Sequence, residues 1–107
     1  MVYEIRIYEA AEGRFEAMRD RFITEVIPRL PKHGVEVLGV FTSEADPGKL
    51  TYITRSANEE ARASGWAAFG ADPEWKAIKA SSEVNGPLLA RQTVSILSPA
   101  VASLLLG

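Results

Sequence analysis

The sequence predicts an α+β fold of the ferredoxin-like type, in which elements follow the order β-α-β-β-α-β and the helices cover one face of a four-stranded antiparallel sheet. Three observations predict it: a pattern of period two opens the chain, two strand-like stretches flank a turn in the middle, and a helical pattern follows each of these parts. Right-handed crossovers place the first strand inside the sheet, beside the third and fourth. We expect one domain over residues 1–107, because a chain of this length builds a single core.

Residues 2–9 form the expected first strand, since side chains of two kinds alternate along them. One face carries Tyr3, Ile5 and Ile7, and the other carries Val2, Glu4, Arg6 and Tyr8. Because this strand is expected inside the sheet, the charged pair on the second face is predicted to be partly removed from water.

The first helix is predicted to run from Gly13, which serves as its N-cap, to about Gly34. Its apolar positions recur at steps of three and four residues, and they are Phe15, Met18, Phe22, Ile23, Val26, Ile27 and Leu30. Pro28 lacks a backbone donor and crowds the carbonyl four residues earlier, so the helix is expected to kink or break near Ile27.

Residues 35–43 and 49–55 form the expected second and third strands, joined by a turn at 45–48. The second strand is apolar on both faces, with Val35, Val37 and Phe41 on one and Leu38 and Val40 on the other. Together with Val2 and Tyr8 of the first strand, this pattern predicts that the sheet face without helices is not left in water. A second copy of the chain is the simplest cover, so we expect a homodimer with sheet packed on sheet.

The second helical region is predicted in two segments that meet at "ADPEW", residues 71–75. Asn58 caps the first segment, which is expected to end at Gly70. Asp72 as N-cap and Pro73 at the first helical position then start the second segment.

The last strand is predicted over residues 88–97, after a break at Gly86 and Pro87. The apolar C-terminal stretch "AVASLLLG", residues 100–107, is far shorter than the ~20 residues of a membrane-spanning helix. We expect this tail to pack on a partner chain.

The composition argues against several classes of function. Twelve Lys and Arg against fourteen Asp and Glu give a net charge of −2 without a basic cluster, so nucleic acid is not an expected partner. The absence of cysteine excludes disulfides and a thiol nucleophile. The N-terminus has neither the basic flank nor the apolar run of a signal peptide, so we expect a cytoplasmic protein without a membrane partner.

Four stretches resemble the NIPSNAP family: "YEIRIYEA" at the start, "RFEAM" behind Gly13, "PKHGVEVLGVF" at 31–41, and "FGADPEWKAI" at 69–78. The resemblance covers nearly the whole chain as one domain. It implies a homodimeric α+β barrel, within a wider group that contains cofactor-free monooxygenases, haem-degrading enzymes, small isomerases and plain binding proteins. It implies no particular reaction, because a shared fold is a weak guide to function.

The polar face of the first strand, with Glu4, Arg6 and Tyr8, is the first candidate site. Arg55, together with Thr51 and Ile53 on the third strand and Arg91, Thr93 and Ser95 on the fourth, is expected to bring partners to it. One interpretation is a pocket for a small anionic or carbonyl-bearing ligand, since a guanidinium group suits carboxylates. The other is a structural network that fixes the register of the sheet or dimer, and we favour it.

His33 is the candidate for acid–base work, because it is the one side chain expected to titrate near neutrality. Its place at a helix end also fits a capping histidine. Trp66 and Trp75 fit core packing and also a ligand cleft between helices and sheet. A lone histidine with scattered carboxylates gives no metal-ligand spacing, and no glycine-rich phosphate loop follows a strand, so neither a metal nor a cofactor is expected.

Three functions follow from these candidates. The first is a dimeric barrel that binds a small organic ligand, with Arg6, Tyr8, His33 and Trp75 as leading pocket residues. The second is a cofactor-independent monooxygenase or isomerase, in which Arg6 and Tyr8 orient the substrate and His33 moves a proton. The third is a purely structural dimerisation module.

Overall fold

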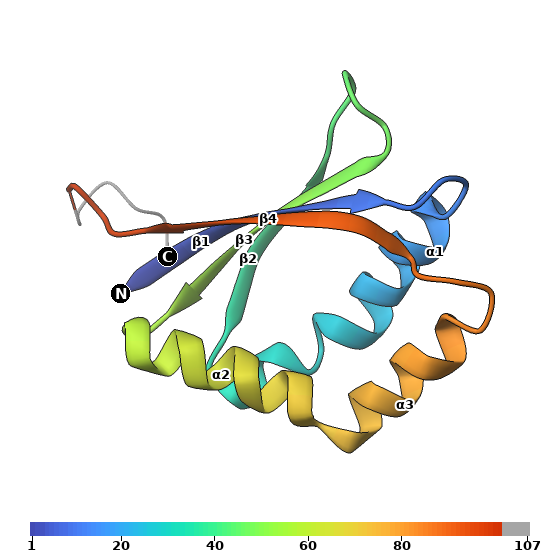
Figure 1. Ribbon diagram of the computed structural model, residues 1–107. Helices are drawn as coiled ribbons and strands as arrows, with labels where there is room; N and C mark the ends of the chain where they lie inside the picture. Colours follow the sequence, from blue (N-terminus) through green and yellow to red (C-terminus); the bar gives the residue numbers. More distant parts are fainter. Residues whose placement is uncertain (102–107) are drawn as a thin grey trace.

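The computed structural model describes residues 1–101. In chain order, its elements are β1 (Val2–Ala10), α1 (Phe15–Arg21), the π-helical turn η1 (Phe22–Val26), the 3₁₀ turn η2 (Leu30–His33), β2 (Glu36–Thr42), β3 (Lys49–Ser56), α2 (Glu59–Ala71), α3 (Pro73–Ser82) and β4 (Leu89–Leu97). The strands form a 4-stranded antiparallel sheet in the order β2-β3-β1-β4. Figure 1 shows the helices gathered on one side of it. The predicted ferredoxin-like α+β fold, with the first strand inside the sheet, is confirmed. Of the C-terminal tail expected to pack on a partner chain, residues 100–107, the last six, 102–107, lie outside the described residues.

The core lies between the helices and the sheet face that they cover. Its buried apolar residues are Met18, Phe22, Val26, Leu30, Val35, Leu50, Tyr52, Phe69 and Leu88. On the same face Glu4 lies opposite Thr54, and Arg6 lies opposite Tyr52, in the register of β1 with β3. The charged pair of the first strand therefore points toward the helices, beside the apolar core.

The first helical region is broken as predicted, but the break begins earlier than Ile27. Helix α1 ends at Arg21, and η1 follows with a backbone bond of 2.9 Å from Ile27 N to Phe22 O. Two details of the prediction are wrong: the residue before α1 is Arg14 rather than Gly13, and Ile23 is 46% exposed. The wider π-helical turn changes the angle between successive side chains, which turns Ile23 away from the core.

Strand β2 contains a β-bulge between Val37 and Gly39, where its register with β3 shifts. A bulge adds one residue, so the side chains after it change faces. Val37 and Val40 both pack on the core, whereas Phe41 is 53% exposed on the other face. The predicted grouping of Phe41 with Val37 and of Leu38 with Val40 is therefore wrong, because strict alternation does not anticipate a bulge.

The second helical region changes direction at a single residue. Asn58 accepts a backbone N–H at 2.8 Å and caps α2, which continues one residue beyond its predicted end at Gly70. Asp72 then accepts two backbone N–H groups of α3, at 2.8 and 3.4 Å, and Pro73 takes the first helical position. The predicted restart is confirmed, and it bends the helical layer at this point (Figure 1).

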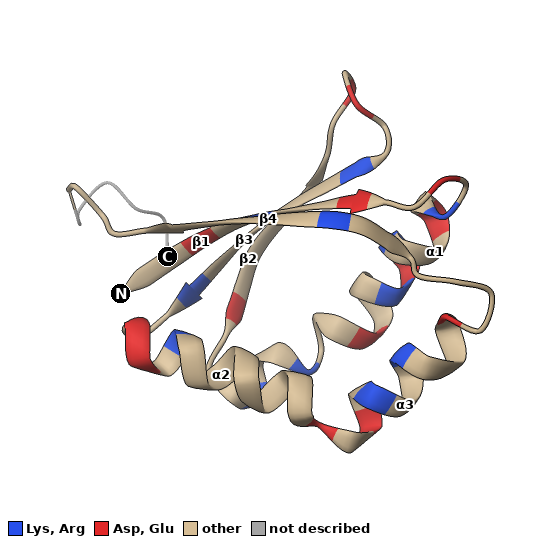
Figure 2. Ribbon diagram, viewed as in Figure 1, with Lys and Arg blue, Asp and Glu red and all other residues tan. Residues whose placement is uncertain are grey.

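Charged side chains of both signs are interspersed along the helices, as Figure 2 shows for α1 and α3. Arg29 of the first helical region pairs with Glu74, and Arg21 pairs with Glu83 at 2.7 Å. These ion pairs tie the first helical region to α3 across the layer. Over residues 1–101, no helix has both the length and the apolar character needed to cross a membrane.

Candidate functional site

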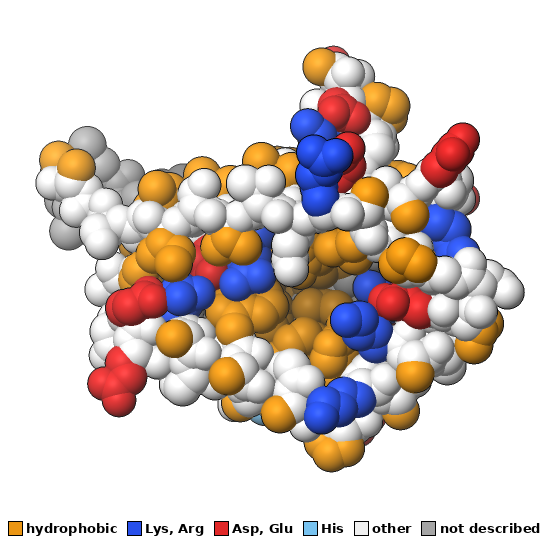
Figure 3. Space-filling view, viewed as in Figure 1, with side chains coloured by type: hydrophobic (Ala, Val, Ile, Leu, Met, Phe, Trp, Pro, Cys, Tyr) orange, Lys and Arg blue, Asp and Glu red, His pale blue; other side chains and the backbone are white. Residues whose placement is uncertain are grey.

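A cavity of about 330 Å³ lies between the covered face of the sheet and the helices. Figure 3 shows it as a hollow with an apolar interior and Lys and Arg side chains at its edges. The lining comes from β1, α1, η1, α2, α3 and β4, so it is assembled from almost the whole length of the chain. Small-molecule sites span roughly 300–1,000 Å³, which places this cavity at the small end of that range.

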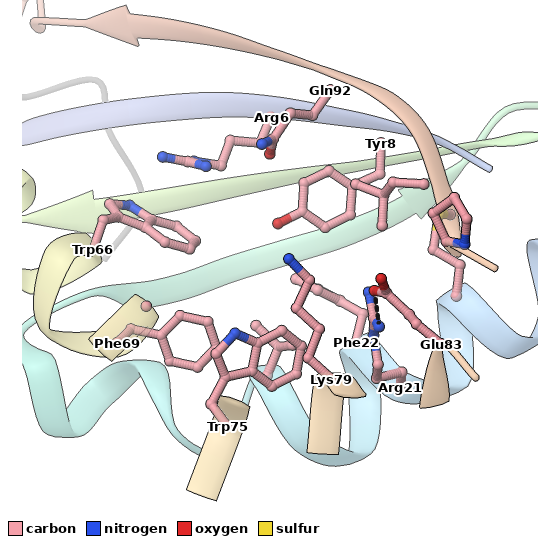
Figure 4. A pocket seen from close by; sticks show the side chains of 15 residues that line it. Arg6, Tyr8, Arg21, Phe22, Trp66, Phe69, Trp75, Lys79, Glu83 and Gln92 are labelled. Atoms are coloured by element: carbon pink, nitrogen blue, oxygen red, sulfur yellow. Dashed lines mark hydrogen bonds and ion pairs between the residues drawn. The ribbon is translucent and has the colours of Figure 1, made fainter. Parts of the chain in front are cut away.

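The sheet side of the cavity carries polar groups from β1 and β4. Arg6 and Tyr8 both point toward the helices, because residues two apart on a strand share a face. Gln92 lies opposite Tyr8 in the register of β1 with β4 and joins them at the cavity wall, as Figure 4 shows.

Tyr8 forms a hydroxyl pair with the buried Tyr52 behind it. The hydroxyl of Tyr52 donates to that of Tyr8 at 2.7 Å, and the rings meet edge to face with centroids 5.1 Å apart. Burial raises the pKa of both phenols, and for Tyr8 it outweighs the opposing effects of the Tyr52 hydrogen bond and of Arg6. Since the Tyr8 oxygen accepts from Tyr52, its own proton is available to a group in the cavity.

Glu4 lies behind Arg6 and is completely buried, with 0% of its surface exposed. It accepts hydrogen bonds from Arg6 at 3.0 and 3.1 Å, Arg62 at 3.1 Å, Thr54 at 2.7 Å and Trp66 at 2.7 Å. Burial alone would raise the pKa of Glu4, but the hydrogen bonds from Thr54 and Trp66, with the charge of Arg6, lower it. The ionised carboxylate thus holds the Arg6 guanidinium over Trp66, 3.7 Å from the ring centroid.

The helix side of the cavity is aromatic. Phe69 near the end of α2 stacks on Trp75 of α3, with centroids 5.0 Å apart and planes at 27°. Trp66 meets the edge of Phe69 at 6.0 Å and 88°. The change of direction at Asp72 brings these three rings together from two helices, because it lets residues on either side of the break face the same space.

Three further charged groups lie at the cavity edge. Arg21 of α1 bonds to Glu83 at 2.7 Å and to the hydroxyl of Ser82 at 3.0 Å. Lys79 of α3 directs its ammonium into the cavity, as Figure 4 shows, and no carboxylate in the described part of the chain forms an ion pair with it. Within residues 1–101, Lys79 is therefore a cavity cation without an ion-pair partner, and as an exposed residue it is solvated by water.

The structure brings together four of the side chains singled out from the sequence. Arg6, Tyr8, Trp66 and Trp75 line the cavity, and Glu4 supports Arg6 from behind. These residues are far apart in the sequence, and the sheet register and the break between α2 and α3 place them around one space.

Arg55 does not join this group. In the register of β1 with β3 it lies opposite Tyr3, on the face that the helices do not cover, and it pairs with Glu36 at 2.8 Å. The other expected partners from β3 and β4, which are Thr51, Ile53, Arg91, Thr93 and Ser95, lie opposite Ile7, Ile5, Glu9, Ile7 and Ile5 in the same registers. The neighbours of Glu4 and Arg6 on β3 are instead Thr54 and Tyr52. Each lies one residue away from an expected partner along the strand, so the expected partners lie on the opposite face of the sheet.

His33 does not line the cavity either. It ends η2, where its ring lies edge-on to Phe69 at 6.4 Å and its Nε2 atom lies 3.8 Å from a carboxylate oxygen of Asp72. This position does not allow His33 to move a proton on a molecule inside the cavity. Among residues 1–101, no three His, Cys, Asp or Glu side chains are grouped in a way that would hold a metal ion.

The sequence interpretation missed Lys79, Arg21, Glu83 and Tyr52 as site residues. A signal for Lys79 exists, because it follows Trp75 by four residues on one helix and so shares its face. Arg21 and Glu83 are 62 residues apart, and no local pattern connects them.

Comparison with known proteins places these features in one family. The NIPSNAP family model matches residues 3–104. No curated protein matches the chain.

Solved structures give the same fold. A NIPSNAP family protein with unknown function from Agrobacterium tumefaciens is 29% identical, with a TM-score of 0.76 over 94% of this chain and 88% of that one. An uncharacterised NIPSNAP domain protein from Burkholderia xenovorans is 21% identical, with a TM-score of 0.77 over 94% and 95% of the two chains. A putative antibiotic biosynthesis monooxygenase from Deinococcus radiodurans is 17% identical, with a TM-score of 0.67 over 100% of both chains. At such low identity the last two similarities concern the fold alone.

Proposed function

The chain belongs to the NIPSNAP family, and from this premise we propose that it binds a small, partly apolar organic molecule in the cavity between sheet and helices. The observation that carries the proposal is a cavity of about 330 Å³ in which Arg6 and Tyr8 face the stacked rings of Phe69 and Trp75. An apolar lining with a few converging polar groups is typical of ligand sites. The protein then acts as a binding or accessory protein.

A purely structural role explains only part of this arrangement. The bonds between Glu4 and Arg6 fix side chains on the covered face, as a structural network does. The same network does not involve the proton of Tyr8 or the ammonium of Lys79, which has no ion-pair partner among residues 1–101, and both groups face the cavity. Lys79 is exposed and solvated, so it needs no partner for stability, but polar groups that converge on an apolar cavity are typical of a ligand site.

We also propose that two copies of the chain form a homodimer through the uncovered sheet face. This face carries the apolar side chains Tyr3, Ile5, Ile7, Leu38, Phe41, Ile53 and Leu97. Leu38, Phe41 and Leu97 are 39%, 53% and 43% exposed in the single chain. Contiguous apolar surface of this kind supports a sheet-to-sheet contact, which would remove it from water.

A cofactor-independent monooxygenase or isomerase is the alternative. The similarity to putative monooxygenases supports it only through the fold. His33 lies outside the cavity, so an enzyme of this type would have to move protons with groups that line the cavity, such as Tyr8. Turnover of a bound compound would favour this alternative over binding alone.

Ligand binding is tested by thermal shift and tryptophan fluorescence with a panel of small carboxylates, quinones and polyphenols. Both tryptophans of the chain line the cavity, so a molecule inside it is expected to change their emission. A ligand at 100 times its Kd stabilises the folded state by about 2.7 kcal/mol, which raises the Tm.

Gln92→Phe is the test variant, because Gln92 is an exposed cavity-wall residue and a ring there fills the space. Val84→Phe is its control, since Val84 is 78% exposed and lies outside the cavity. We expect hits with the unchanged protein and with Val84→Phe, and their loss with Gln92→Phe. A panel without any hit, or hits that persist in Gln92→Phe, would contradict the proposal.

A further inference from the structure

We propose that the ligand of this cavity is an aromatic monocarboxylate and that Lys79 binds its carboxylate group. The inference rests on the proposed function, because it concerns the same cavity. Three observations support it: the balance of charge around the cavity, the positions of two hydrogen-bond donors (the Lys79 ammonium and the Tyr8 hydroxyl), and the shape of the aromatic wall.

The charged groups in and directly behind the cavity do not balance. The charged groups are the cations Arg6, Arg21, Arg62 and Lys79 and the carboxylates Glu4, Glu59 and Glu83. They form one network around Glu4, one separate pair of Arg21 with Glu83, and Lys79, which belongs to neither. Glu4 pairs with Arg6 and Arg62 at 3.0 and 3.1 Å, Arg62 also pairs with Glu59 at 2.7 Å, and Arg21 pairs with Glu83 at 2.7 Å. The set therefore has an excess of one positive charge, which one monovalent anion neutralises.

The excess charge is located on Lys79. Its ordinary helical partner would be Glu83, four residues further along the chain. Arg21 takes that carboxylate instead, at 2.7 Å, which leaves the Lys79 ammonium without an ion-pair partner in the described residues. Lys79 is an exposed residue, so water solvates its ammonium in the empty cavity. An anion that enters the cavity pairs with this ammonium beside the apolar rings, where the attraction between the two charges is stronger than in bulk water.

The Tyr8 hydroxyl on β1 is a second hydrogen-bond donor, on the wall of the cavity opposite α3 and Lys79. The Tyr8 hydroxyl accepts from Tyr52, and its raised pKa keeps its own proton in place near neutrality. Figure 4 shows the Lys79 ammonium reaching from α3 toward the Tyr8 side chain on β1. An ammonium and a neutral phenol together offer donors to the two oxygens of a carboxylate.

The aromatic wall favours a flat apolar body for the rest of the ligand. The stacked pair Phe69 and Trp75 and the edge-on Trp66 form a continuous ring surface on the helix side. Aromatic rings pack well on such a surface in offset or edge-to-face contact. The volume of about 330 Å³ restricts the ligand to a small molecule.

The test compares a naphthoate with the corresponding naphthylmethanol, a neutral molecule of similar shape, by fluorescence titration and calorimetry. We expect the naphthoate to bind about tenfold or more tightly than the alcohol, the size of one hydrogen bond to a charged group. Lys79→Gln is expected to remove about tenfold of the naphthoate affinity and to leave alcohol binding within about twofold. Lys79→Arg keeps the charge and should retain most of the preference.

Lys76→Gln is the matched control, because Lys76 is an exposed lysine of the same helix that does not line the cavity. It should leave both affinities unchanged. If the alcohol binds as tightly as the naphthoate, or if Lys79→Gln leaves their ratio intact, the assignment of a carboxylate to Lys79 is overturned while the proposed function stands. If neither probe binds the unchanged protein, the aromatic monocarboxylate is excluded, and an empty result from the wider panel would also exclude the proposed function.

Discussion

At the scale of single residues, the carboxylate of Glu4 organises one side of the cavity. It has four side-chain partners on three different elements, and each of its oxygens accepts at least two hydrogen bonds. A buried charge persists only when its hydrogen-bonding capacity is satisfied in this way. The network fixes the guanidinium of Arg6 against Trp66 and so determines the shape of that cavity wall.

Replacing Glu4 by Gln is expected to destabilise the protein by about 3 kcal/mol, because it leaves two cations without their shared carboxylate. The side chains of Arg6 and Arg62 are only 10% and 13% exposed, so water does not compensate them fully. Urea unfolding gives the measurement. The control is Glu59→Gln, which removes a carboxylate of the same network that is 59% exposed and should change stability by about 0.5 kcal/mol or less.

The pH dependence of the Glu4→Gln effect provides a second check on this prediction. The folded-state pKa of Glu4 lies below its ordinary value of 4.5, so ionised Glu4 stabilises the fold fully above that value. This contribution is lost as the pH falls through the folded-state pKa. The stability difference between the two proteins should therefore stay constant above about pH 5 and shrink in more acidic solution. A difference that is small at neutral pH would contradict the structural role of Glu4.

At the scale of elements, the position of α2 depends on its close contact with η2. Gly65 is buried in α2, and a Cβ atom at this position would collide with the backbone carbonyl oxygen of His33 and come within 3.1 Å of Val35. Trp66 is the next residue along the helix. The missing side chain therefore lets α2 lie close enough to the sheet for Trp66 to reach Glu4.

Gly65→Ala is expected to destabilise the protein by about 1–3 kcal/mol, since backbone atoms must shift to accept the new methyl group. The usual effect of this exchange inside a helix is the opposite, a gain of up to about 1 kcal/mol. Gly70→Ala in the same helix is the matched control, because nothing lies within 4 Å of the position that its methyl group would take, and the usual gain should appear. Thermal unfolding of the two variants gives the comparison, and equal effects would show that the contact between α2 and η2 is not tight.

At the scale of the whole molecule, the sheet separates two surfaces with different roles. One face holds the core and the cavity, and the other carries the apolar side chains that we propose as a dimer contact. The helices of the described chain lie on the first side, as Figure 1 shows, so they do not cover the second. Ligand binding and dimer formation are thus assigned to opposite faces and are open to separate tests.

Phe41→Lys and Ile53→Lys are each expected to convert the proposed homodimer into a monomer, because a charge on the outer face resists removal from water. Phe41 is 53% exposed, so its replacement should leave the fold of the single chain intact. Light scattering after size-exclusion chromatography measures the mass. Val84→Lys, at a position that is 78% exposed and outside the sheet, should keep the dimer. A single-chain mass for the unchanged protein at micromolar concentration would rule out the dimer.

The sequence determined the features that depend on neighbours along the chain. Period-two alternation predicted β1, and the pair Asp72 and Pro73 predicted the restart between α2 and α3, because capping and turn geometry are local. The order of these elements, with the handedness of crossovers, was enough for the fold class and the strand order. The motifs along the chain were enough to predict the family.

Only the tertiary structure decided which side chains meet. The bulge in β2 moved Phe41 to the outer face, and the register of β3 against β1 placed Tyr52 and Thr54, rather than Arg55, beside Arg6 and Glu4. A register shift of one residue exchanges the two faces of a strand, so no pattern within one strand reveals its partners. The excess charge on Lys79 likewise depends on an ion pair between residues 62 apart in the chain. Local periodicity thus determines the elements of this protein, whereas the pairing of charges that shapes its cavity exists only after the elements have packed.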